Sequence, residues 1–156
     1  MKHLLICLVV LLCVANTSAQ MRRSQNTELK IGTINNLSNY LDGCGCYFKS
    51  TPASKKSESY IFLAETANSN GNRAWINIDR QVTALKFVSS TYRNQRLKRG
   101  SSYIETYRSS NVTARITYVV TSPSAPGGEL TKYASSIVVT KDNRSKTVKA
   151  VGECGC

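Results

Sequence analysis

Two Cys-Gly-Cys motifs contain the residues best suited to carry chemistry in this sequence. Cys44 and Cys46 form the first motif, and Cys154 and Cys156 form the second, at the end of the printed chain. Cysteine sulfurs crosslink a chain as disulfides or bind zinc as thiolates. Residues two apart in an extended chain point to the same side, so each motif presents both sulfurs on one face of a strand. The spacing predicts that the N-terminal Cys-Gly-Cys segment lies beside the C-terminal strand.

The sequence allows three interpretations of the four cysteines. We favour two disulfides that join the 44/46 motif to the 154/156 motif, because the count is even and the N-terminus predicts export to an oxidising compartment. Alternatively, the four thiolates bind a structural Zn²⁺, although Cys-x₂-Cys is the commoner zinc spacing. In the third interpretation each motif closes on itself, in a strained bond typical of redox activity. Four cysteines allow three pairings, and their spacing does not choose among them.

The residue types argue against most catalytic designs. No cofactor is favoured, and a structural zinc bound by the four cysteines is the alternative. The only histidine is His3, inside the predicted export signal, so the mature chain has no Ser-His or Cys-His pair. We find no Gly-x-Ser-x-Gly elbow and no phosphate-cradling glycine loop. The spacing of the carboxylates singles out no glycosidase pair. The carboxylates considered are Asp42, Glu58, Glu65, Asp79, Glu105, Glu129, Asp142 and Glu153.

A dense basic cluster lies between Tyr92 and Tyr103 and ends directly before Gly100, which predicts a hairpin loop. After removal of the export signal the chain has 20 basic and 9 acidic side chains, a net charge of +11. Such a charge favours anionic partners, namely polysaccharide, lipid headgroups or nucleic acid. The alternative is that the charge serves solubility or protects a sheet edge. The predicted anion-binding residues are Arg93, Arg96, Lys98 and Arg99.

The N-terminus has the layout of a secretory signal, with Lys2 and His3 followed by the apolar run 4–15 and by small residues up to Ala19. Twelve apolar residues are too few for a spanning helix, which needs about 20. We therefore expect cleavage after Ala19 and a secreted, periplasmic or extracellular protein without a transmembrane segment. Lipid anchoring at Cys13 is the alternative. The predicted organisation is a signal peptide at 1–19, a flexible polar leader at 20–28 and a single β domain at 29–156.

Alternation of apolar and polar residues dominates the predicted domain. From Val112 to Val120 every second residue is apolar, and Thr113, Arg115 and Thr117 lie on the other face, as in a half-buried strand. Similar segments separated by turn residues predict an all-β fold of about seven or more short strands, either an antiparallel sandwich or a small barrel. The other predicted strands are 59–65, 74–79, 82–89, 103–108, 134–141 and 146–154. Ile31–Leu41 fits a helix or a strand and turn equally well.

Three functional interpretations follow, in order of preference. The first is an exported, non-catalytic β domain that binds an anionic ligand or surface. The second is a structural exported protein whose positive charge serves solubility only, and the third is an enzyme without histidine chemistry. Trp75 suits either a stacking platform or, more commonly, a core position. The sequons at Asn36, Asn111 and Asn143 matter only where the source glycosylates asparagine.

Overall fold

The computed structural model describes residues 28–52, 59–66, 72–93, 96–125, 128 and 130–156, so the predicted signal and nearly all of the leader lie outside it. The described part contains nine strands and one short 3₁₀ helix, and no α-helix. The all-β prediction is confirmed. The elements are β1 (Ile31–Gly32), η1 (Leu37–Asn39), β2 (Gly45–Ser50), β3 (Phe62–Glu65), β4 (Arg73–Ile78), β5 (Gln81–Ser90), β6 (Ser102–Arg108), β7 (Val112–Ser122), β8 (Thr131–Lys141) and β9 (Arg144–Gly155).

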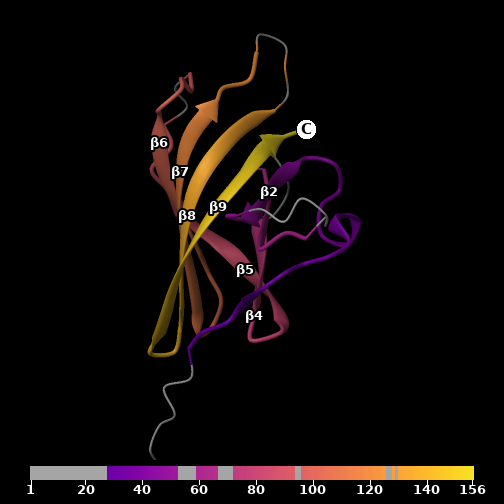
Figure 1. Cartoon of the computed structure of the whole chain (residues 1–156), viewed down its shortest axis with the longest axis vertical. Coiled ribbons are helices and arrows are strands. Elements are labelled where there is room, and N and C mark those ends of the chain that lie inside the picture. Colours follow the sequence, from indigo (N-terminus) through magenta and orange to yellow (C-terminus); the bar gives the residue numbers. More distant parts are fainter. Residues whose placement is uncertain (1–27, 53–58, 67–71, 94–95, 126–127, 129) are drawn as a thin grey trace, which may run out of the picture.

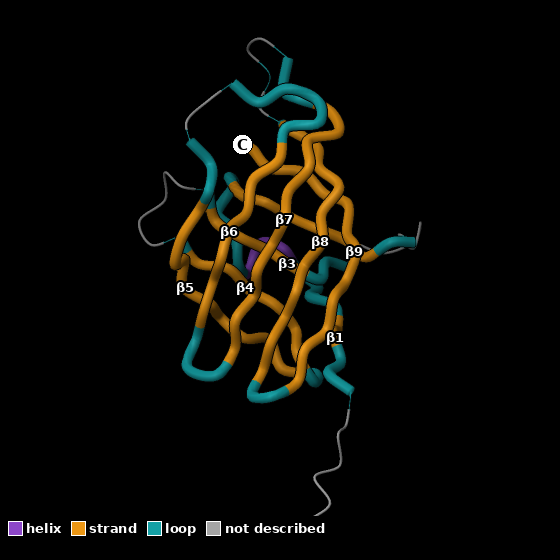
Figure 2. The backbone as a smooth tube through the Cα atoms, turned by 90° about the vertical axis from the view of Figure 1, so that its left-hand side faces the viewer, coloured by secondary structure: helices purple, strands orange, loops and turns teal. Residues whose placement is uncertain are grey.

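The sheet is closed into a barrel, which resolves the choice between sandwich and barrel. All pairings are antiparallel, and the strand order is β1-β4-β3-β2-β9-β8-β7-β6-β5. An additional pairing of β4 with β5 joins eight strands in a ring, with β1 as a ninth strand beside β4. Figures 1 and 2 show the long strands β6 to β9 forming one wall and the shorter β2 to β4 the other. Closure leaves these strands few unpaired backbone groups.

The barrel interior follows the alternation seen in the sequence. The five β7 side chains predicted to share one face are all buried, and Tyr118 is fully inaccessible to solvent. On the wall formed by β2 to β4, Phe48 of β2 and Phe62 of β3 lie opposite each other in register, and their rings pack in the barrel interior. Gly152 of β9 pairs with Phe48, and a Cβ there would come within 2.5 Å of the Phe48 ring. A glycine is therefore required where β9 passes the aromatic core.

A second apolar cluster lies outside the barrel, where the N-terminal segment covers β3 and β4. Ile34, Leu63 and Trp75 belong to it, together with Leu41 and Tyr60. Trp75 is 8% exposed, and its ring meets the edge of Tyr40 at a centroid distance of 5.6 Å. It is therefore a core residue. The segment 31–41 that covers it contains β1 and η1 and is otherwise irregular, with no α-helix.

Ion pairs join the elements at the lower end of the barrel in Figure 1. Asp79, in the turn between β4 and β5, accepts hydrogen bonds from Lys141 at 3.2 Å and from Arg144 at 3.0 Å. Glu28 pairs with Lys146 of β9, and the adjacent Leu29 is buried in the barrel core. The chain before β1 therefore packs against the bottom of the barrel. Within the described residues, no helix has the length and apolar character needed to cross a membrane.

Candidate functional site

The cysteines lie at the opposite end of the barrel, where β2 begins and β9 ends (Figure 1). The register pairs Cys46 with Cys154 across the two strands, and these residues form one disulfide. The second disulfide joins Cys44 to Cys156. The crosslinking of the two motifs is confirmed, and the fold supplies the pairing that their spacing left open.

Disulfide sulfurs are not thiolates, so the zinc interpretation applies only to the reduced protein. Disulfides are typical of proteins in oxidising compartments.

The basic cluster occupies the loop between β5 and β6, residues 91–101, at the same end as the disulfides. We call it the basic loop. Two backbone hydrogen bonds tie it to Val120 near the end of β7, one from Gly100 and one to Ser101, each 2.9 Å long. Leu97 packs against the barrel core, and the Tyr92 and Tyr103 rings lie 5.3 Å apart. The predicted residues Arg93, Arg96, Lys98 and Arg99 are all exposed.

No ion pair links these four side chains to a described residue. The basic residues Lys141, Arg144 and Lys146 of the opposite end pair with Asp79 or Glu28. At the lower end these three cations share two carboxylates, whereas the four cations of the basic loop share none with a described residue. Asn94 and Gln95 of this loop lie outside the described residues.

A carboxylate lies among tyrosines inside the barrel, a feature that the sequence analysis did not single out. Glu105 of β6 accepts a hydrogen bond from the Tyr107 hydroxyl at 2.8 Å. Tyr103 stacks on Tyr118 at 4.6 Å, and Tyr133 meets Tyr118 edge-on at 5.5 Å. Burial raises the pKa of Glu105, and burial together with Glu105 raises the pKa of Tyr107. Burial raises the pKa of the Tyr118 hydroxyl well above its ordinary value, and the neighbouring Tyr107 and Glu105 add to this shift.

The alternation of β6 contains the signal that would have located Glu105. Tyr103, Glu105 and Tyr107 share one parity, and the two tyrosines mark that parity as inward-facing. Other considered carboxylates make structural contacts: Glu65 pairs with Arg73, and Asp79 with Lys141 and Arg144. Glu58 and Glu129 lie outside the described residues.

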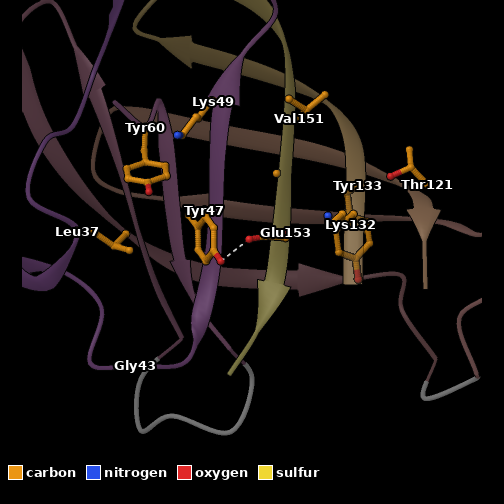
Figure 3. A pocket seen from close by; sticks show the side chains of 11 residues that line it. Leu37, Gly43, Tyr47, Lys49, Tyr60, Thr121, Lys132, Tyr133, Val151 and Glu153 are labelled. Carbon is orange, nitrogen blue, oxygen red and sulfur yellow. Dashed lines mark hydrogen bonds between the residues drawn. The ribbon is translucent and has the colours of Figure 1, made fainter. Parts of the chain in front are cut away.

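A groove on the outer wall brings together residues that no sequence motif connects. It has a volume of about 700 Å³ and runs over the outer face of β2 and β9 between the N-terminal segment and β8. Figure 3 shows Lys49 and Tyr60 on one side, Lys132 and Thr121 on the other, and Glu153 between them pointing toward Tyr47. We call it the outer groove.

The polar centre of the outer groove is a short hydrogen bond. The Tyr47 hydroxyl donates to Glu153 Oε1 at 2.6 Å. Burial and the neighbouring Glu153 carboxylate raise the pKa of Tyr47 to about 12, so the hydroxyl remains a proton donor at neutral pH. Lys49 lies with its ammonium group 5.1 Å from the centre of the Tyr60 ring, a cation–π contact.

The three asparagines of the sequons that follow the predicted signal are all exposed. Asn36 precedes η1, whereas Asn111 and Asn143 lie in the turns before β7 and β9. The Asn111 side-chain amide donates to Asp142 at 3.1 Å, which joins these two turns. All three positions are open to modification in a source that glycosylates asparagine.

The fold and its crosslinks define the class: a closed eight-stranded antiparallel barrel in which a pair of disulfides joins the start of β2 to the end of β9. A scan against protein-family models gives no match. Searches of curated proteins and of solved structures give no match either.

Proposed function

We propose that the protein is an exported, non-catalytic β-barrel that binds an anionic polymer or surface through the basic loop. The observation that carries the proposal is the arrangement of charge. Arg93, Arg96, Lys98 and Arg99 lie exposed on one loop and make no ion pair with a described residue. Closely spaced cations of this kind attract polyanions and release their counterions on binding.

Export is part of this proposal. The predicted signal at 1–19 lies outside the described residues, but the two disulfides suit an oxidising compartment. The chain would then meet the anionic polysaccharides or lipid headgroups of a cell exterior, which are partners of the expected chemistry.

The anchoring of the loop supports a binding role over solubility alone. Charges that serve only solubility need no fixed position, whereas a recognition surface gains affinity when it is ordered before binding. The contact of the partly buried Leu97 with the core and the hydrogen bonds to Val120 hold the second half of the loop against the barrel. Tyr92 and Tyr103 place aromatic rings beside the charges.

The test replaces Arg93, Arg96, Lys98 and Arg99 together by glutamine and measures binding to heparin and to single-stranded DNA from 50 to 300 mM salt. We expect at least about tenfold weaker binding and a shallower salt dependence, because fewer counterions are released. The matched control replaces Lys86, Arg108, Arg115 and Lys149, which are exposed on the barrel wall and carry the same charge. An equal loss in both variants would show that the charge is diffuse and would favour the solubility function.

A further inference from the structure

We propose that the outer groove is a binding site for an acidic saccharide, separate from the basic loop. The groove is open to solvent and has a volume of about 700 Å³, within the range of ligand sites in proteins. Its walls supply cations, a hydrogen-bonding centre and apolar surface within one concavity. This combination matches a sugar that bears a carboxylate or sulfate group.

The two lysines supply positive charge on opposite sides of the groove (Figure 3). Neither Lys49 nor Lys132 forms an ion pair with a described residue, although Lys132 lies opposite Glu153 in the strand register. The Tyr60 ring positions the Lys49 ammonium group through the cation–π contact. Either ammonium group can therefore donate charge-assisted hydrogen bonds to an anionic substituent of a ligand.

The centre of the groove offers acceptor capacity that suits sugar hydroxyls. One oxygen of Glu153 accepts the Tyr47 proton, and its other oxygen, Oε2, receives no hydrogen bond from a described residue. A carboxylate oxygen is an acceptor only, so its natural partner is a ligand hydroxyl. Tyr47 acts as a positioning residue, because its hydroxyl orients the Glu153 carboxylate.

The same carboxylate disfavours a phosphate polymer. Every phosphate group carries negative charge and acceptors only, so Glu153 would repel it at the centre of the groove. A saccharide carries hydroxyl donors as well as its anionic group. Val151, which is 40% exposed beside Lys49 in the strand register, provides apolar surface for the C–H face of a sugar ring.

The experiment measures binding of trigalacturonic acid by calorimetry, with neutral maltotriose and tripolyphosphate as comparison probes. We expect trigalacturonate to bind more tightly than maltotriose, and Lys49→Gln and Lys132→Gln each to weaken its binding about tenfold. Lys149→Gln is the matched control, because Lys149 lies on the outer face of β9 but does not line the groove. It should change the affinity less than twofold.

Glu153→Gln distinguishes a saccharide site from simple charge attraction. Loss of the carboxylate should weaken trigalacturonate binding, because an acceptor for the sugar hydroxyls is altered. It should strengthen tripolyphosphate binding, because the repulsion between Glu153 and the phosphate groups is removed. A variant that binds both anions more tightly would overturn the proposal, as would a parent protein that does not bind trigalacturonate. The fourfold basic-loop variant should retain trigalacturonate binding within twofold. If only the loop variant loses it, the groove is not the site, whereas the function proposed for the basic loop stands.

Discussion

Glu105 places a carboxylate among the tyrosine rings of the barrel interior. Burial of an ionised carboxylate is costly, and the hydrogen bond from Tyr107 offsets part of that cost. The balance leaves the pKa of Glu105 above its ordinary value of 4.5, because burial outweighs the hydrogen bonds. The folded state thus binds this proton more tightly than the unfolded state does.

A Glu105→Gln variant should separate this effect from the rest of the molecule. The contribution of Glu105 to stability is fully present below the ordinary pKa of 4.5 and is lost as the pH rises through the raised value. Glutamine accepts the Tyr107 hydrogen bond but does not ionise. We expect the stability of the variant relative to the parent to increase from pH 4 to pH 8, as measured by thermal unfolding. A difference that stays constant over this range would contradict the assignment.

At the level of elements, the turn between β4 and β5 uses an unfavourable residue. Ile78 pairs with Gln81, so Asp79 and Arg80 form a two-residue hairpin loop, with φ angles of 53° and 73°. Positive φ at both positions is typical of a type I′ turn, for which Asp-Gly is among the preferred sequences. Arg80 has a Cβ in this left-handed region, which costs on the order of 1 kcal/mol.

Arg80→Gly should therefore stabilise the protein by about 0.5 to 1 kcal/mol, since glycine adopts this conformation without the steric cost. Urea unfolding at neutral pH measures the change. Arg80→Ala is the control, because it removes the charge and keeps the Cβ. A similar gain from alanine would show that charge repulsion, and not backbone conformation, limits the turn.

At the level of the whole molecule, the two disulfides are nested and partly redundant. They join residues 112 and 108 positions apart in the sequence. The first crosslink to form closes a loop of more than 100 residues, which the loop-closure model rates at about 4.7 kcal/mol. Once it is formed, the second closes only a ring of roughly six residues, worth about 2 kcal/mol in the same model.

We expect removal of one disulfide, by alanine at Cys44 and Cys156 or at Cys46 and Cys154, to cost about 2 kcal/mol, and removal of both to cost about 7 kcal/mol. The inner pair should cost the more of the two, because Cys46 is buried and Cys154 packs against the core. Urea unfolding without reductant measures all three variants. Equal costs that add to the cost of removing both would contradict the nested model. The intact parent mass should lie about four hydrogen masses below that of the reduced chain, since each disulfide removes two hydrogens.

Strand formation could be predicted from the sequence because side-chain alternation is a local property. The seven predicted segments correspond to β3 to β9, and the inward parity of Cys46 and Cys154 follows from the same period of two. The fold therefore confirms the prediction that the first Cys-Gly-Cys segment lies beside the last strand. The clustering of the four predicted basic residues on one loop also follows from their closeness in the chain.

Only the tertiary structure decided which strands are neighbours across long sequence separations. The pairing of β4 with β5 closes the ring, and the register of β2 with β9 selects the disulfide pairing. The same register brings Tyr47 to Glu153, more than 100 residues apart, and so creates the outer groove. Burial of Glu105 likewise depends on walls contributed by other strands. Alternation defines the two faces of each strand, but the register between distant strands depends on how the whole core packs together.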